Sequence, residues 1–233
     1  MIIGASVVHN DLHVFSKLLE SFEGLCDKLV IVDDGSSECT EKERHDLISK
    51  SFSKPFIFKR IEKSKKEYER RSMLWSMLCE NSNRGDWIVL LDSDECYYNK
   101  ELPELKELML IHSNINYIST RLYNMWSETH YRVDGYWNPT YGIKRRIFRM
   151  FKDSVYRPDN FNPDTIECGE VPKYVFGLRG IDTGYKLLHL GYIRQEDRQR
   201  KYDFHKKVDA EGKFHLSSHI NSIIQEPVLL ELK

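Results

Sequence analysis

The sequence predicts an α/β fold in which a mostly parallel, Rossmann-like sheet is flanked by helices. Strand-like apolar runs alternate with helix-like segments over the first hundred residues, and such alternation requires crossovers between parallel strands. The run at residues 87–91 is apolar throughout, as expected for a strand covered on both faces. It ends in the acidic run Asp92-Ser93-Asp94-Glu95. Because such sheets bind ligands beyond the carboxyl ends of their strands, this tip is a candidate site.

Each element of the first half follows from its own pattern, in chain order. Residues 2–8 are almost entirely apolar and predict the first strand. Residues 12–24 place apolar side chains three or four positions apart and end at a glycine, which predicts a helix. The same reasoning predicts strands at 29–32, 55–61 and 87–91, and helices at 38–51, 68–81 and 101–111.

The pattern loosens after residue 111. Residues 117–122 and 146–151 predict two more strands, and the charged segment 196–210 predicts a helix. Between the strands lies an aromatic, turn-rich stretch, and residues 156–172 carry three prolines. Long loops of this kind often build binding sites, so we expect an irregular active-site segment or lid there.

Composition narrows the class of protein. The chain has 233 residues, of which 40% are hydrophobic and 30% charged, which is typical of a globular domain with one sizeable core. Its net charge of -1 argues against a general nucleic-acid binder. Its five cysteines are scattered without a CxxC pair, which favours reduced thiols over a disulfide framework or a zinc site. Without a secretory signal or an apolar run long enough for a membrane span, the sequence predicts a cytoplasmic enzyme.

The acids at the strand tips suggest metal chemistry. Since side chains alternate along an extended chain, Asp92 and Asp94 can point to one side, where hard oxygen donors suit Mg²⁺ or Mn²⁺ holding a substrate diphosphate. The alternative is a turn that caps the next helix. A second apolar strand, 29–32, also ends in paired acids, Asp33 and Asp34. We expect the two strand ends to lie side by side.

Three segments of the sequence together resemble motifs of a known protein family. In order, they are residues 6–11 (Ser-Val-Val-His-Asn-Asp), 30–36 (Val-Ile-Val-Asp-Asp-Gly-Ser) and 87–95. They resemble the family 2 glycosyltransferases with the GT-A fold over residues 1–110. Residues 146–149 and 189–192 are similar to shorter late elements of bacterial and phage members. The resemblance implies a nucleotide-sugar-binding half at 1–110, an acceptor-binding and catalytic half at 111–194, and a C-terminal helical extension at 195–233.

The resemblance assigns a nucleotide site. It places Asp34 against the uracil of a UDP-sugar, with Asp33 beside it and the backbone of Val7, Val8 and His9 completing the pocket. A carboxylate that accepts a hydrogen bond from the ring N–H favours uracil over other bases, because other bases leave the buried carboxylate without a donor. The alternative is that both acids only cap the following helix.

The resemblance also implies roles around the diphosphate. Asp94 would bind the metal directly, Asp92 would reach the ribose or a metal-bound water with Ser93 between them, and His189 would add a metal ligand. Arg71 would face the diphosphate, since a guanidinium fits phosphate geometry. Arg70 and Lys66 are alternatives, as is an ordinary solvated helix face.

Family members generally invert the anomeric centre, which requires a base for the acceptor hydroxyl. Glu170 is the first candidate because it lies in the interval where the family places its base. Glu167, Asp134 and Asp182 follow, and the chain lacks the clear Glu-Asp pair of the family there.

Aromatic and basic side chains of the later half leave alternatives open. Trp126, Tyr136 and Trp137 could stack on an acceptor or form local core. The basic run 144–149 could attract a phosphorylated acceptor or be a solvent-facing edge.

The leading hypothesis is a metal-dependent hexosyltransferase that moves a hexose from a UDP-sugar to an acceptor hydroxyl. The acceptor is a glycan, a lipid-linked saccharide, a protein or a modified nucleobase, and a homodimer is an open alternative. A nucleotidyltransferase is the rival enzyme, although the first strand is not followed by a glycine-rich, lysine-containing phosphate loop. A catalytically silent module that binds a glycan or a partner is the non-enzymatic rival.

Overall fold

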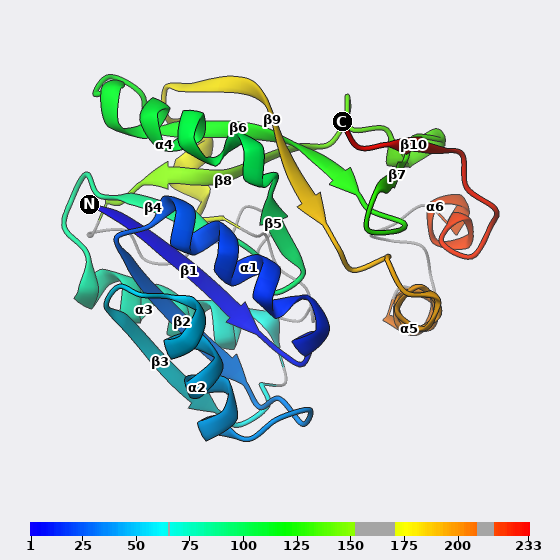
Figure 1. The fold of residues 1–233 in the computed structure, drawn as a ribbon, viewed down its shortest axis with the longest axis horizontal. Coiled ribbons are helices and arrows are strands. Elements are labelled where there is room, and N and C mark those ends of the chain that lie inside the picture. The colour runs from blue at the N-terminus through cyan, green and yellow to red at the C-terminus, as the bar shows by residue number, and fades with distance from the viewer. Residues whose placement is uncertain (65, 152–170, 209–216) are drawn as a thin grey trace.

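The computed structural model describes residues 1–64, 66–151, 171–208 and 217–233. Eight strands form one sheet in the order β3-β2-β1-β4-β8-β6-β9-β5 (Figure 1). These strands are β1 (Ile2–Val8), β2 (Lys28–Asp34), β3 (Phe56–Ile61), β4 (Trp87–Leu90), β5 (Glu95–Tyr97), β6 (Tyr117–Asn124), β8 (Ile143–Arg149) and β9 (Gly180–His189). A separate antiparallel pair consists of β7 (His130–Arg132) and β10 (Leu229–Glu231).

The predicted mostly parallel α/β sheet is confirmed. Neighbours within β3-β2-β1-β4 are all parallel, and so are β6 and β9, whereas β8 runs antiparallel to both β4 and β6. The expectation that the two acidic strand ends are adjacent is wrong, because β1 lies between β2 and β4. Both ends still open at one edge of the sheet, on either side of the end of β1.

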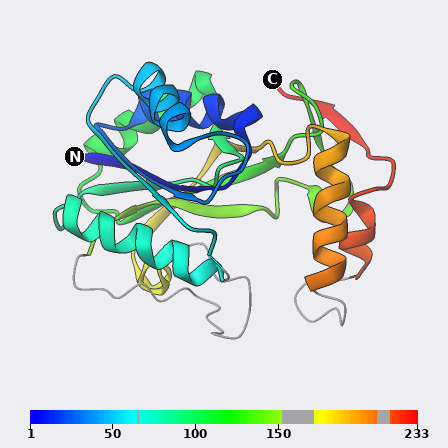
Figure 2. The same ribbon diagram turned by 90° about the horizontal axis from the view of Figure 1, so that it is seen from below.

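Helices cover both faces of the sheet. They are α1 (Leu12–Leu25), α2 (Glu41–Ser51), α3 (Glu67–Asn81) and α4 (Leu102–Ile111), followed by α5 (Gln195–Val208) and α6 (Ser217–Ser222). Figure 2 shows α1, α2 and α4 on one face and α3 on the other. One core cluster therefore lies under α1 and a second under α3. Gly4 allows α1 to approach β1 closely, since a Cβ there would stand 2.6 Å from the ring of Phe22.

Two element boundaries in the structure differ from the predicted ones, and local hydrogen bonds explain both differences. The helix predicted from residue 38 begins at Glu41, because Thr40 caps it: the Glu43 N–H donates to Thr40 Oγ1 at 3.2 Å, and Glu43 Oε2 accepts from Thr40 N at 2.7 Å. The strand predicted at 87–91 ends at Leu90. A turn follows, in which the Glu95 N–H donates to the Asp92 carbonyl oxygen at 3.0 Å. The acids therefore lie on a turn and not on an extended chain.

The C-terminal helices α5 and α6 lie side by side beyond the end of the main sheet (Figures 1 and 2). An aromatic cluster lies beneath them: Trp126, Trp137, Tyr192 and Ile223 are buried, and Tyr202 packs against them. The local-core interpretation is therefore confirmed for Trp126 and Trp137, which are 8% and 3% exposed, whereas Tyr136 is 50% exposed. Among the described residues, none of the helices combines the length and apolar character needed to cross a bilayer.

Candidate active site

A cleft of ≈ 580 Å³ opens at the carboxyl edge of the sheet. Its walls come from the end of β1, the first turn of α3, the turn after β4, the end of β9 and one side of α5. The topology predicts a ligand site at this edge, because the ends of parallel strands point to one side. What the sequence did not predict is the wall contributed by α5.

Asp34 lies immediately behind one wall of the cleft. It is fully buried, and its Oδ1 accepts from the Ser64 N–H at 2.7 Å. Its Oδ2 lies 3.3 Å from Lys63 Nζ and 3.6 Å from Arg70 Nη1, and both of these cations line the cleft. His9 also lines the cleft, with its Nδ1 2.8 Å from the Asp34 carbonyl oxygen. Asp34 therefore positions charged side chains at the cleft wall.

Asp33 lies deeper. Its Oδ1 accepts from the Ser36 N–H at 2.8 Å, and its Oδ2 is 3.7 Å from Nε of the buried Arg44. Arg44 in turn donates to the carbonyl oxygen of Asn10 at 3.2 Å. The predicted residues Asp33 and Val8 thus lie in the buried layer beneath the cleft, where Asp33 ties the loops after β1 and β2 together. Val7 lines the cleft itself.

Asp92 is held by two arginines. Arg71 Nη2 donates to its Oδ1 at 3.0 Å, and Arg146 Nη2 donates to its Oδ2 at 2.5 Å. Burial acts to raise the pKa of Asp92, but the two guanidinium groups outweigh it and hold the pKa below its ordinary value. Arg71 also donates to Glu67 at 2.6 Å, so its predicted phosphate-facing guanidinium already binds two acids. Arg70 and Lys63 are the more exposed cations on this side.

Asp94 takes part in a different group of contacts. Its Oδ2 lies 3.1 Å from Nε2 of His189 and accepts from Lys201 Nζ at 2.8 Å. Lys201 Nζ is also 3.2 Å from His189 Nε2. Burial acts to raise the pKa of Asp94, whereas Lys201 and His189 lower it, and the net pKa is well below its ordinary value. Asn124 Oδ1 lies 2.9 Å from His189 Nδ1 and orients the imidazole.

A further carboxylate, Asp11, reaches the cleft from the loop after β1. Its backbone is left-handed, with φ of 55°, and Ser93 Oγ donates to its Oδ2 at 2.7 Å. Arg200 Nη2 lies 3.4 Å from its other oxygen. Burial and the neighbouring charge of Asp94 raise the pKa of Asp11. Asp11 is therefore the cleft carboxylate, among those described, whose pKa shifts toward that of a proton acceptor.

The predicted metal ligands meet only in part. Asp94 and His189 come together, whereas Asp92 points to its arginines, because residues 92–94 form a turn. Within the described ranges, no group of three or more His, Cys, Asp or Glu side chains is placed to hold a metal. One carboxylate and one imidazole suit Mg²⁺ or Mn²⁺ when substrate phosphate oxygens and water complete the shell. The pair fits a divalent ion on condition that Lys201 moves aside.

The two candidate bases that the structure describes, Asp134 and Asp182, are not among the residues that line the cleft. Glu170 and Glu167 lie outside the described residues. Asp134 accepts from Arg132 Nε at 2.5 Å and from the Val228 N–H at 2.8 Å, and it lies away from the cleft. Asp182 is exposed on β9, and Lys66, the alternative phosphate contact, precedes α3 outside the cleft lining.

Reasoning from the sequence missed Lys201 and Arg200. The segment 196–210 was predicted as a helix from its charge, and no motif set these two residues apart from their charged neighbours. Arg146 was grouped with an exposed basic run, but the structure buries it to 1% exposure beneath Asp92 and Glu95. The apolar pair that follows Arg146 is the signal that could have identified it, since Arg146 is buried together with Ile147 and Phe148, whereas Lys144 and Arg145 are half-buried.

One solved structure shares the fold, and two others are more distantly similar. A mannosyltransferase from Pyrobaculum calidifontis, solved with GDP-Man and Mn2+, superposes with a TM-score of 0.53 at 10% identity, covering 88% of this chain and 61% of that chain. A nucleoside-diphosphate-sugar pyrophosphorylase from Vibrio cholerae RC9 has a TM-score of 0.49 at 9% identity, with coverage of 86% and 98%. An inositol-1-phosphate CTP transferase from T. maritima has 0.44 at 14%, with coverage of 92% and 96%.

Sequence comparison is more specific than these structural likenesses. No curated protein sequence matches the chain. The model of the family described as glycosyl transferase family 2 matches residues 7–163, which is more than half of the chain. This range contains both acidic strand ends and stops before β9 and α5. The chain therefore belongs to glycosyl transferase family 2.

Proposed function

We propose that this chain transfers a hexosyl group from a UDP-sugar to an acceptor hydroxyl. The observation that carries the proposal is the cleft at the sheet edge of a family 2 chain, where Asp94 and His189 face a set of cationic side chains. The cations in its lining include Lys63, Arg70 and Arg200. Cationic side chains at a cleft attract anionic ligands, and a diphosphate is such a ligand.

The nucleoside end of the donor would lie against the β1 and β2 side. His9 lines the cleft and contacts the Asp34 backbone. The uracil contact predicted for Asp34 requires Lys63 and Arg70 to move from its carboxylate, which lies buried behind the cleft wall. These two cations would then be available to the diphosphate. The Arg70 guanidinium and the Lys63 ammonium both lie within 4 Å of the buried Oδ2 of Asp34. An anionic ligand in the cleft can attract both groups away from this oxygen.

Asp94 and His189 are the residues that would hold Mg²⁺ or Mn²⁺, with diphosphate oxygens completing the shell. When bound, the ion would neutralise charge on the departing UDP. Asn124 would keep the imidazole in its orientation, and the Arg71 and Arg146 pair would keep Asp92 ionised and fixed. The mannosyltransferase of similar fold was solved with Mn2+ and a guanine nucleotide sugar, so GDP-Man belongs among the donors to be compared.

Removal of the proton from the acceptor hydroxyl remains a prediction for Glu170 or Glu167. Asp11 is a third candidate, because it lines the cleft and its pKa is raised by burial and by Asp94. Glu170→Gln, Glu167→Gln and Asp11→Asn would each be compared in single-turnover assays. The base is the residue whose loss slows transfer while donor affinity is retained.

A donor screen tests the function. UDP-glucose, UDP-galactose, their acetamido forms and GDP-Man would be titrated calorimetrically with Mn²⁺ or with EDTA, and nucleotide release would be followed by chromatography. We expect one UDP-sugar to bind best and to release UDP. Asp94→Asn should lose release, whereas Asp46→Asn, a change at an exposed acid of α2 outside the cleft, should not.

Two results would count against the proposal. If none of these nucleotide sugars binds or releases its nucleotide, donor use by this cleft is wrong. If a labelled nucleotide is found joined to the product, the chain is a nucleotidyltransferase.

A further inference from the structure

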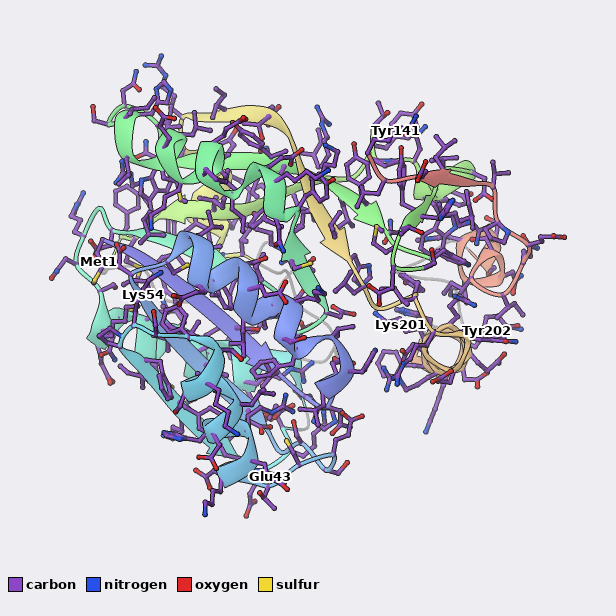
Figure 3. The ribbon with its side chains drawn as sticks, in the orientation of Figure 1. Met1, Glu43, Lys54, Tyr141, Lys201 and Tyr202 are labelled. Carbon is purple, nitrogen blue, oxygen red and sulfur yellow. The ribbon has the colours of Figure 1, made fainter. Side chains whose placement is uncertain are left out.

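Lys201 occupies the central position of the acidic end of the cleft. It lies on the side of α5 that faces the main sheet (Figure 3). Its Nζ lies 2.8 Å from Asp94 Oδ2 and 3.2 Å from His189 Nε2, and those two atoms are themselves 3.1 Å apart. A single cation therefore already bridges the carboxylate and the imidazole.

The side chains and backbone around the Lys201 ammonium favour a cation at this position. The ring of Tyr192 lies 4.9 Å from Lys201 Nζ, which adds a cation–π contact. Gly191 leaves the necessary room, because a Cβ at this position would collide with both Asp94 Oδ2 and Lys201 Nζ. The lysine side chain is only 22% exposed, so its charge is satisfied by these partners more than by water.

The helix that carries Lys201 is fixed independently. Arg194 holds Asp197 through two bonds of 2.7 and 3.0 Å, and Asp197 lies 3.2 Å from His13 of α1. Arg200 reaches Asp11 from the same helix. The ammonium can therefore leave Asp94 by rotation of its flexible four-carbon stem, while α5 stays in place.

We propose that Lys201 is a built-in counter-ion of the Asp94 and His189 pair, and that a divalent cation must displace it to bind there. The positions exclude each other, because an ammonium and a metal ion cannot both lie within bonding distance of the same two acceptor atoms. The displaced ammonium remains tethered in the cleft, next to Arg200. The inference rests on the proposed function for the divalent ion at this pair, Mg²⁺ or Mn²⁺.

Metal affinity without nucleotide is the first test. Mn²⁺ binding to the full chain would be measured by the loss of the free-ion paramagnetic resonance signal. We expect Lys201→Met to bind Mn²⁺ more tightly than the unaltered chain by about tenfold, an ordinary size for the coupling of two ligands. Lys201→Arg keeps the charge and should stay within about threefold of the unaltered chain. Lys206→Met is the matched control, because Lys206 is an exposed lysine of α5 outside the cleft, and its loss should change nothing.

The second test uses the unaltered chain, so it does not depend on how a variant folds. Lysines would be acetylated with and without Mn²⁺ and quantified by mass spectrometry. We expect acetylation of Lys201 to rise with Mn²⁺ while that of Lys206 stays constant. Equal Mn²⁺ affinity in Lys201→Met and the unaltered chain, or unchanged acetylation of Lys201 at saturating Mn²⁺, would overturn the proposal. Both readouts omit nucleotide, so failure of the donor screen alone leaves this result standing.

Discussion

Replacement of Arg146 by methionine should destabilise the fold strongly. Arg146 is 1% exposed, and its Nη2 donates to Asp92 at 2.5 Å and to Glu95 at 2.6 Å. Methionine fills much of the same space but removes the charge that both acids face. Removing one partner of a buried ion pair typically costs about 3–5 kcal/mol, because it leaves buried charge uncompensated. For a chain of this size, about 2–4 °C of melting temperature is lost per kcal/mol, so a fall of about 6–20 °C is expected.

The assay is urea unfolding followed by circular dichroism, with Arg121→Met as the control. Arg121 lies on the neighbouring strand β6, is partly exposed and makes one bond of 3.1 Å to the Thr140 carbonyl oxygen, so its loss should cost about 1 kcal/mol or less. Adding Glu95→Gln to Arg146→Met should recover part of the stability, because it removes one of the two uncompensated acids. A loss below about 1 kcal/mol for Arg146→Met, as for a surface pair, would refute the reasoning.

Three further predictions concern pH, packing and thiols. Burial acts to raise the pKa of Asp197, but its hydrogen bonds to Arg194 lower the pKa, and the net pKa is below the ordinary value. The contribution of Asp197 to stability is therefore fully present above its unfolded pKa of about 3.9, and it is lost as pH falls through the lower folded pKa. In urea titrations at acid pH, Asp197→Asn should flatten this decline, and an unchanged slope would contradict the assignment. Gly4→Ala should lower the free energy of unfolding by about 1–3 kcal/mol, because the new methyl group meets the Phe22 ring, and a neutral result in the same assay would mean that α1 can shift. Burial raises the pKa of the Cys96 thiol to about 12, so mass spectrometry should find it alkylated by iodoacetamide only after unfolding; rapid labelling of the native chain would contradict its burial.

Local patterns were enough to predict most of the first half. Apolar runs identified β1, β2 and β4, and periodic stripes identified α1 and α3, because each element buries a face that its own sequence defines. The family follows from the same region, since the acidic strand ends lie within the matched range 7–163. The family resemblance also singled out Asp94 and His189, which do meet.

Partners of the acids could not be predicted in this way. Arg146 is 54 positions from Asp92, and Lys201 is 107 positions from Asp94. Periodicity reports which face of an element is buried, but not which distant side chain completes a charge pair. The alternation argument for Asp92 and Asp94 failed for a different reason: β4 ends at Leu90, and the bond from the Glu95 N–H turns the chain.

The contact between Asp11 and Arg200 joins positions that are 189 residues apart. Residues from early and late in the chain thus line the same cavity. Binding of a ligand in that cavity is therefore thermodynamically linked to the packing of the last helices against the main sheet. A ligand that binds only the assembled cavity raises the free-energy cost of detaching α5, and this increase grows with the ratio of free ligand concentration to Kd. Protease resistance of the C-terminal region should therefore increase with ligand concentration, even though much of that region lies outside the sequence that defines the family.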